Sequence, residues 1–360
     1  MIQLTSRDRV LIRMPSWLGD FIMAEPALRA LIEQRALFDD AAPISLVAPA
    51  PFLELLDGRF DGVARIPARR DGDASDWSGH DVAIFLDGSM RSVWRAIRAG
   101  IPNRVGWARG GRGLLLTDSV RPALERGATP VGLGRPGRWP RILPRPFGSV
   151  CHELVAAMGV PVFDVRPRLE VAERARESVR ERIAAAGANP DEPFVLVNAG
   201  ARPGSAKGYD PSQWARALDQ LEGPGSQRIF VVGGPGEEAR VSATVEAARR
   251  EHVHALLDPV AGLPELAAWC AAAELVMTTD GGTRHVAAAV GTRQVVLFGP
   301  TDPRHTADVW ESERHQRVEV DCGPCHRERC PVVGELHHVC MTGIRPEDVA
   351  SVGAGSAAPS

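Results

Sequence analysis

Residues 275–290 read LVMTTDGGTRHVAAAV, which is a short apolar run, a pair of glycines and an alanine-rich segment in succession. The run over 275–279 is typical of a buried strand, and the segment over 286–290 is typical of a helix. Where a strand turns through glycines into a helix, backbone N–H groups and the helix dipole converge, which favours a bound phosphate group. The stretch therefore predicts one strand of a parallel α/β sheet with an anion site at its carboxyl end.

Apolar runs alternate with helical patterns through the rest of the chain. Strands that alternate with helices predict parallel, doubly wound sheets, so the expected fold class is α/β. The expected strands cover residues 10–13, 44–48, 82–86, 194–198, 229–232, 275–279 and 295–298.

The chain has 360 residues, and at about 150 residues per domain this length suggests two domains. We expect an N-terminal Rossmann-like domain over 1–165, a C-terminal Rossmann-like domain over 166–350 and a disordered tail over 351–360. Ligands of open α/β sheets bind beyond the carboxyl ends of the strands. The two sheets are therefore expected to face a central cleft.

Composition excludes several classes of protein. Hydrophobic residues make up 44% and charged residues 24% of the chain, as in globular rather than disordered proteins. No run of about 18 apolar residues is present that could cross a bilayer, and the charged start is unlike a signal peptide. Six cysteines are too few for a secreted disulfide scaffold. We therefore expect a cytoplasmic protein.

Positive charge is concentrated in one region. Residues 91–145 contain twelve arginines and two acidic residues, although the whole chain carries a net charge of −3. Part of this region, 121–147, is rich in proline, glycine and arginine and predicts a long basic loop. Such a region favours an anionic partner. Nucleic acid is disfavoured because the chain is mildly acidic and no aromatic stacking platform interleaves these arginines.

Asp20 is the first candidate for chemistry. It ends the segment PSWLGD (15–20), which joins the first expected strand to the first expected helix. An aspartate there can cap the helix, which is the structural interpretation. The functional interpretation is a general base, because a carboxylate at this edge can accept a proton from a bound hydroxyl.

Lys207 is the only lysine among 42 basic residues. It lies in a loop of small residues, 198–209, that follows the first strand of the second domain, and Ser205 lies two residues before it. Small residues let the backbone approach a ligand, and a lysine offers a mobile charge for a phosphate. Ser205 is therefore a candidate for donor binding and Lys207 a candidate for catalysis at the donor phosphates, with a solvated surface lysine as the alternative.

The glycine turn after the strand at 275–279 supplies further candidates. Asp280, Gly281 and Gly282 open the turn, and Thr283 and His285 can add side-chain donors to a phosphate. A single histidine at such a place is more often a capping or packing residue.

Glu237 follows the expected strand over 229–232 and the turn GGPG (233–236). It can accept hydrogen bonds from the ribose of a nucleotide. The alternative is structural, since a glutamate in the first turn of a helix is favourable without any ligand.

Four cysteines are clustered near the end of the chain, and no paired-aspartate motif marks a divalent-metal anchor. We expect metal-independent chemistry with no cofactor. The spacing of the cysteines leaves zinc binding and buried thiols both open. They are Cys322, Cys325, Cys330 and Cys340.

Taken together over nearly the whole chain, these segments resemble glycosyltransferase family 9, the ADP-heptose:lipopolysaccharide heptosyltransferases, and above all their heptosyltransferase II branch. The most specific matches are 15–20 with 24–28, 280–289, 298–301 and 322–341. The resemblance implies a two-domain GT-B fold, with an ADP-sugar donor held mainly by the second domain and the acceptor by the first.

The resemblance also implies the reaction. Heptose would move from ADP-heptose to the anionic lipopolysaccharide inner core with inversion at the anomeric carbon. Asp20 matches the family's general base and Lys207 its donor-phosphate lysine. The basic region suits the acceptor and a peripheral contact with the cytosolic face of the inner membrane.

The family's phosphate-binding loop, D-S-G-x-x-H, falls on residues 280–285. The chain departs from the family pattern at Gly281, where serine is usual, at Asn198, where histidine is frequent, and at Tyr209, where tryptophan is frequent. No charged catalytic group is lost. These departures bear on the identity of the sugar and of the acceptor.

Three alternatives remain open at this point. The chain could be a family 9-like transferase that uses another nucleotide sugar or an acceptor other than lipopolysaccharide. It could be a nucleotide-sugar epimerase, which would turn over without an acceptor. It could also be a noncatalytic binding module, which would bind without turnover.

Overall fold

The computed structural model describes residues 2–69, 74–121, 124–125, 141–142, 144–202, 204–223, 225–307 and 313–354. The chain forms two compact units, the first mainly from residues up to 170 and the second mainly from residue 171 onward. In the described part of the chain, no helix is long and apolar enough to cross a membrane.

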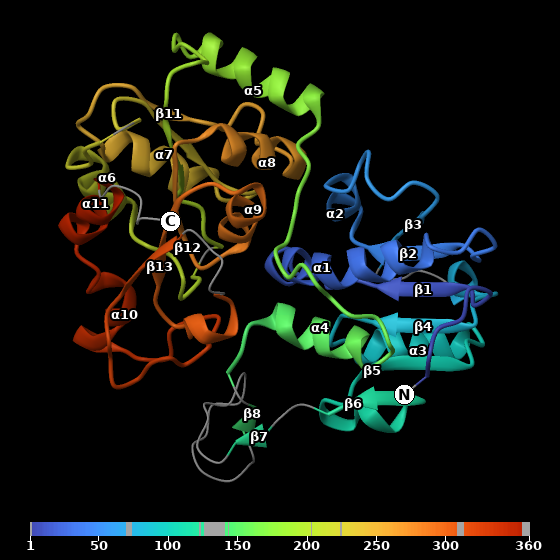
Figure 1. Ribbon diagram of the computed structural model, residues 1–360. Coiled ribbons are helices and arrows are strands. Elements are labelled where there is room, and N and C mark those ends of the chain that lie inside the picture. The colour runs from blue at the N-terminus through green and yellow to red at the C-terminus, as the bar shows by residue number, and fades with distance from the viewer. Residues whose placement is uncertain are drawn as a thin grey trace. The chain divides into compact units, whose positions relative to one another are not determined.

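The first unit contains a six-stranded parallel sheet in the order β3-β2-β1-β4-β5-β6 (Figure 1). In the centre, Val10 of β1 pairs with Ile44 of β2 on one side and with Val82 of β4 on the other. The strands are β1 (Val10–Arg13), β2 (Ile44–Ala48), β3 (Ala64–Pro67), β4 (Val82–Phe85), β5 (Asn103–Trp107) and β6 (Asp118–Val120).

Helices cover this sheet and explain its continuous apolar strands, because a parallel sheet is buried on both faces. Leu11, Val47 and Phe85 pack against Val93 of α3 and Trp77 of η1, and α1 packs against α4. The helices are α1 (Leu18–Arg35), α2 (Ala50–Glu54), η1 (Ala74–Trp77), α3 (Met90–Arg98), η2 (Gly110–Leu114) and α4 (Phe147–Ala156), and the short strands β7 (Leu124–Glu125) and β8 (Arg141–Ile142) pair antiparallel.

The second unit repeats this architecture with the strand order β11-β10-β9-β12-β13-β14. The strands are β9 (Val195–Asn198), β10 (Ile229–Val232), β11 (Val253–Ala255), β12 (Leu275–Thr279), β13 (Gln294–Phe298) and β14 (Glu313–Arg317). The helices are α5 (Glu173–Ala185), α6 (Pro211–Asp219), α7 (Glu238–Ala247), α8 (Leu263–Ala272), α9 (Gly282–Val290), η3 (Pro303–His305), η4 (Gly334–Leu336), α10 (Val339–Thr342) and α11 (Pro346–Ala354).

In both sheets the strand order reverses beside the first strand of the unit, between β1 and β4 and between β9 and β12. Open sheets bind their ligands at such a reversal, beyond the carboxyl ends of the strands. The predicted α/β fold with two doubly wound sheets is confirmed.

Several outer strands escape prediction from sequence. The strand over 313–317 reads ERHQR, and β5 over 103–107 reads NRVGW, so neither shows an apolar run. Outer strands are less enclosed than central ones, and polar side chains are tolerated there. Residues 122–123, 126–140 and 143 of the predicted basic loop lie outside the described residues.

The predicted disordered tail over 351–360 is wrong for its first residues. Helix α11 continues to Ala354, because Val349 is fully buried in the core of the second unit and Gln316 donates a hydrogen bond to the carbonyl oxygen of Asp348. Residues 355–360 lie outside the described residues.

Candidate functional site

The second unit brings two of the candidate segments to one edge of its sheet. At the strand-order reversal, Leu275 of β12 pairs with Val195 of β9. Asn198 ends β9 and Asp280 directly follows β12. Because the strands are parallel, both residues lie at the carboxyl edge, where such sheets bind ligands.

Asp280 fixes the amine of Lys207 at this edge. Lys207 Nζ donates to the Asp280 carbonyl oxygen at 2.7 Å and to Oδ2 at 3.1 Å, and Arg284 Nη1 donates to Oδ1 at 3.2 Å. Asp280 is 2% exposed, whereas the Lys207 side chain is 40% exposed. Burial alone would raise the pKa of Asp280, but the charges of Lys207 and Arg284 outweigh it and hold that pKa below its usual range.

The loop that carries Lys207 is held through its backbone. The hydroxyl of Ser205 accepts from the N–H of Lys207 at 3.3 Å. The N–H of Ala206 donates to the carbonyl oxygen of Glu328 at 2.7 Å, and His338 Nε2 lies 2.6 Å from the carbonyl oxygen of Ala206. The position of Lys207 therefore depends on the cysteine-rich segment near the end of the chain.

Helix α9 begins directly after Asp280, with Gly281 as its N-cap. The backbone of Gly281 is extended (φ −137°), and a Cβ there would meet the carbonyl oxygen of Thr279 at 3.7 Å, an ordinary contact. The position therefore has room for a serine. Thr283 in the first turn is buried, and its hydroxyl accepts from the side-chain amide of Asn198, which ties α9 to β9.

His285 lies in the interior of α9 and is 4% exposed. Burial, reinforced by the charge of Arg284, lowers the pKa of His285 well below its usual value, so its ring is neutral. Gly282 and Thr283, in contrast, stand at the start of the helix, where backbone N–H groups have no partner within the helix.

Glu237 reaches back from the start of α7 toward the end of β9. Its Oε2 accepts from the N–H of Gly234 at 2.8 Å, and a Cβ on Gly200 would lie 2.0 Å from the same oxygen. A Cβ at position 200 would therefore displace this carboxylate from its present place. The structure therefore places Glu237 next to the turn that leads to Lys207.

This arrangement is suited to a diphosphate. Lys207 supplies a reachable positive charge, and the first turn of α9 supplies N–H groups and the positive end of a helix dipole. Asp280 has a different task, because a carboxylate repels a phosphate. It positions Lys207 and neutralises the buried Arg284, whose side chain is fully enclosed.

Asp20 lies in the first turn of α1 in the first unit and is half-buried. The N-cap of this helix is Trp17, three residues earlier, so the structure does not place Asp20 at the cap itself. Asp20 faces α4, which carries Cys151. Burial is the main cause that raises the pKa of the Cys151 thiol, and the negative charge of Asp20 adds to it.

An open cavity of about 1150 Å³ lies in the first unit at the strand-order reversal between β1 and β4. Five arginines and two tryptophans line it, together with the segment that precedes α1. Trp94 is 52% exposed, so its ring is available to a ligand. The lining residues are Arg13, Ser16, Pro49, Ala68, Arg69, Ala74, Trp77, Ser89, Met90, Arg91, Ser92, Trp94, Arg95 and Arg98.

The buried carboxylate of Asp87 holds two arginines at the base of this region. Arg13 Nε lies 3.6 Å and Arg112 Nη2 3.7 Å from Asp87, and the hydroxyl of Ser92 donates to it at 2.6 Å. Arg13 also donates to the hydroxyl of Ser16 at 2.7 Å. Burial raises the pKa of Asp87, and the arginines and Ser92 act in the opposite direction.

Sequence reasoning found three of these five arginines, because Arg91, Arg95 and Arg98 belong to the basic region. It missed Arg13 and Arg69, which come from other strand ends. For Arg13 the signal was its place as the last residue of an expected strand, since a parallel sheet gathers its ligand contacts at that edge. Arg69 follows β3, a strand that was not expected from the sequence.

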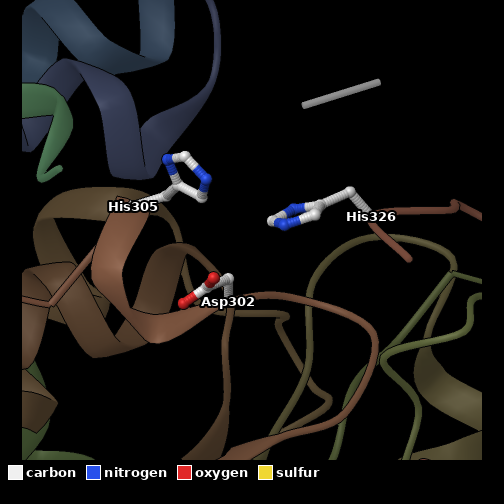
Figure 2. A group of neighbouring side chains, drawn as sticks. All are labelled: Asp302, His305 and His326. Atoms are coloured by element: carbon white, nitrogen blue, oxygen red, sulfur yellow. The ribbon is translucent and has the colours of Figure 1, made fainter. Parts of the chain in front are cut away.

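The four late cysteines are free thiols that line one small cavity of about 30 Å³ with His338. Burial is the main cause that raises the pKa of Cys340 to about 11, and the other three thiols act in the same direction. Among the residues that the structure describes, no three of these thiols come within 4.8 Å of one another. The ligand atoms of a different group, Asp302, His305 and His326, do lie within 4.8 Å of one another (Figure 2). Of the four, Cys340 is buried, Cys325 and Cys330 are half-buried and Cys322 is exposed.

The chain is similar to known proteins over most of its length. The family model described as glycosyltransferase family 9 (heptosyltransferase) matches residues 137–334. The curated lipopolysaccharide heptosyltransferase 2 of Escherichia coli K12 is 26% identical over 358 residues, which cover 95% of this chain and 96% of that protein.

Two solved structures from Escherichia coli are similar over both units. ADP-heptose LPS heptosyltransferase II matches with a TM-score of 0.68 and 23% identity, covering 96% of this chain and 98% of that one. The heptosyltransferase WaaC with ADP-2-deoxy-2-fluoro heptose matches with a TM-score of 0.61 and 18% identity, covering 93% and 98%. The predicted GT-B fold class is thereby confirmed.

Proposed function

Because this chain belongs to glycosyltransferase family 9, we propose that it transfers heptose from ADP-heptose to the inner core of lipopolysaccharide, with inversion at the anomeric carbon. The observation that carries the proposal is the amine of Lys207, anchored on Asp280 beside the start of α9. Both solved relatives are heptosyltransferases, and one was solved with an ADP-heptose analogue.

The donor half of the proposal rests on charge. When the bond between the sugar and the diphosphate breaks, negative charge grows on the departing ADP. Lys207 and the N–H groups at Gly282 and Thr283 are fixed before the reaction, so they stabilise this charge at little cost in reorganisation. Glu237 and the adjacent Gly200 suit contacts with the ribose.

The acceptor half rests on the cavity of the first unit. Its five arginines suit phosphate or carboxylate groups, since guanidinium groups pair with both in bidentate geometry. The exposed ring of Trp94 suits the apolar face of a sugar. The same positive charge suits a peripheral contact with the anionic cytosolic leaflet of the inner membrane.

In the proposed reaction, Asp20 accepts the proton of the acceptor hydroxyl. The hydroxyl oxygen then forms a bond to the anomeric carbon on the face opposite the diphosphate, and the bond from that carbon to the diphosphate oxygen breaks. The proton remains on Asp20, and ADP leaves with the electron pair. One displacement of this kind inverts the anomeric centre.

The test is ADP release by the purified chain with ADP-heptose, in the presence and absence of a heptose-deficient lipopolysaccharide core. We expect release that depends on the core. Release with another nucleotide sugar, or with another acceptor, would redirect the proposal within the family. Turnover without acceptor would indicate an epimerase, and tight ADP binding without turnover would indicate a binding module.

Removal of Arg91 and Arg98 tests the acceptor cavity. Both side chains are exposed on α3, so the double variant Arg91→Ala with Arg98→Ala is expected to fold normally. It should raise KM for the core about 10-fold or more with kcat little changed, because each lost contact to a charged group is worth on the order of 1.5–3 kcal/mol.

The matched control is Arg7→Ala, which removes an arginine on the same unit whose side chain is 88% exposed and which does not line the cavity. Addition of salt should raise KM for the wild-type chain and much less for the double variant, because screening acts on the same charges. An unchanged KM in the double variant would place the acceptor elsewhere.

A further inference from the structure

Three metal-ligating side chains converge in a part of the chain that the proposed reaction does not use. The carboxylate of Asp302 and a ring nitrogen each from His305 and His326 all lie within 4.8 Å of one another (Figure 2). Asp302 and His305 stand three residues apart, around the turn η3, and His326 belongs to the loop after β14. No other group in the described residues brings three such ligands this close.

The ligand set has a recognisable chemistry. Two imidazoles and one carboxylate bind first-row divalent metals such as zinc and iron(II) and leave at least one position open to water. Bonds of about 2.0–2.2 Å in a tetrahedral arrangement place ligand atoms about 3.3–3.6 Å apart. The side chains therefore need only small rotations to close around an ion.

The surroundings hold two of the ligands in place. Asp302 is 1% exposed, so its carboxylate is almost enclosed, and His305 and His326 are half-buried. The N–H of His326 donates to the carbonyl oxygen of Pro300 at 2.8 Å. The backbone of His326 has a positive φ of 53°, which is uncommon for a residue other than glycine. This backbone aims the ring of His326 at the segment that carries Asp302.

The group is connected to the donor site by short steps. His326 lies within the electrostatic reach of Asp280 and Lys207. Two residues further on, the carbonyl oxygen of Glu328 accepts from the N–H of Ala206, the neighbour of Lys207. An ion that joins His326 to Asp302 would therefore fasten the loop against which the backbone of Lys207 rests.

We propose that Asp302, His305 and His326 form a binding site for a divalent transition-metal ion of the zinc class, which fastens the loop around His326 to the turn after β13. The ion has a structural task beside the donor site. In the proposed reaction Asp20 remains the general base, and Lys207 remains the group that stabilises the negative charge of the leaving group.

The test is metal binding by the full chain, which needs neither donor nor acceptor. The chain is stripped with a chelator, dialysed and titrated with Co²⁺, whose visible absorption reports its ligands. We expect one Co²⁺ per chain with nitrogen and oxygen ligands and no sulfur-to-cobalt charge-transfer band, and displacement by Zn²⁺. Metal should raise the unfolding temperature of the wild-type chain.

His326→Ala and His305→Ala each remove one ligand of three. Each should weaken the binding of Co²⁺ by more than about 100-fold, since even loss of an outer-shell partner costs about 10–100-fold. Each should also abolish the rise in unfolding temperature. The control is His337→Ala, an exposed histidine near the cysteines, which should bind as the wild type does.

Several results would overturn the proposal. The first is that the wild-type chain binds no metal. The second is a charge-transfer band that assigns the ion to the cysteines, and the third is wild-type affinity for Co²⁺ in both variants. If His326→Ala does not fold, His305→Ala in the partly exposed turn carries the test. The experiment measures metal binding, so its outcome does not depend on transferase activity. A chain without transferase activity could still bind the ion.

Discussion

Asp20→Asn is expected to lower kcat by about 10²–10⁴-fold, the range that a positioned general base contributes. Asparagine keeps the shape of the side chain and its ability to accept hydrogen bonds, but it cannot take a proton from the acceptor hydroxyl. KM for the donor should change little, because Asp20 belongs to the first unit and the donor residues to the second. The measurement is steady-state ADP release at saturating donor and core.

A pH profile separates a base from a merely structural aspartate. Wild-type kcat should fall on the acidic side as Asp20 is protonated, and this limb should disappear in Asp20→Asn. The control is Glu33→Gln, which removes an exposed acid from the same helix, α1. Near-normal turnover by folded Asp20→Asn would refute the assignment and point to another group as the base.

Lys207→Ala has the second of the two largest expected effects, a loss of about 10²–10³-fold in kcat, as when one preorganised donor to a developing charge is removed. The fold should survive. Asp280 keeps its ion pair with Arg284 at 3.2 Å, so the buried carboxylate still has a positively charged partner. Affinity for ADP, measured by calorimetry, should fall as well.

Arg216→Ala is the matched control for Lys207→Ala, because it removes one positive charge from an exposed position on α6 in the same unit. It should leave kcat and ADP affinity unchanged. If Lys207→Ala kept wild-type kcat but bound ADP weakly, the amine would contribute equally to ground state and transition state. If neither quantity changed, the donor phosphates would have to lie elsewhere.

Much of the donor site could be predicted because its parts are local. Asp280 to Thr283 follow one apolar strand without interruption, and strand, turn and helix start are all visible in the sequence. The contact between Lys207 and Asp280 was not visible, since 73 residues separate them. The resemblance to a family paired them, and the structure shows the physical reason, which is that β9 and β12 are neighbours.

His285 illustrates the opposite case. Its spacing from Asp280 allowed a role as a phosphate donor, but helical geometry turns its ring into the interior, where it is neutral. Only the packing of α9 against its sheet settles which face a residue of the first turn occupies. The same applies to Glu237, whose place depends on the absence of a side chain at Gly200.

By itself, the sequence determined the two doubly wound sheets and the segments that carry function, because the alternation of apolar strands and helices is a local pattern and parallel strands end at a common edge. Tertiary structure alone decided which distant side chains meet. Arg13 and Arg69 join Arg91 in one cavity, and His326 joins Asp302 and His305, because strand order and loop packing bring together residues that no sequence spacing relates.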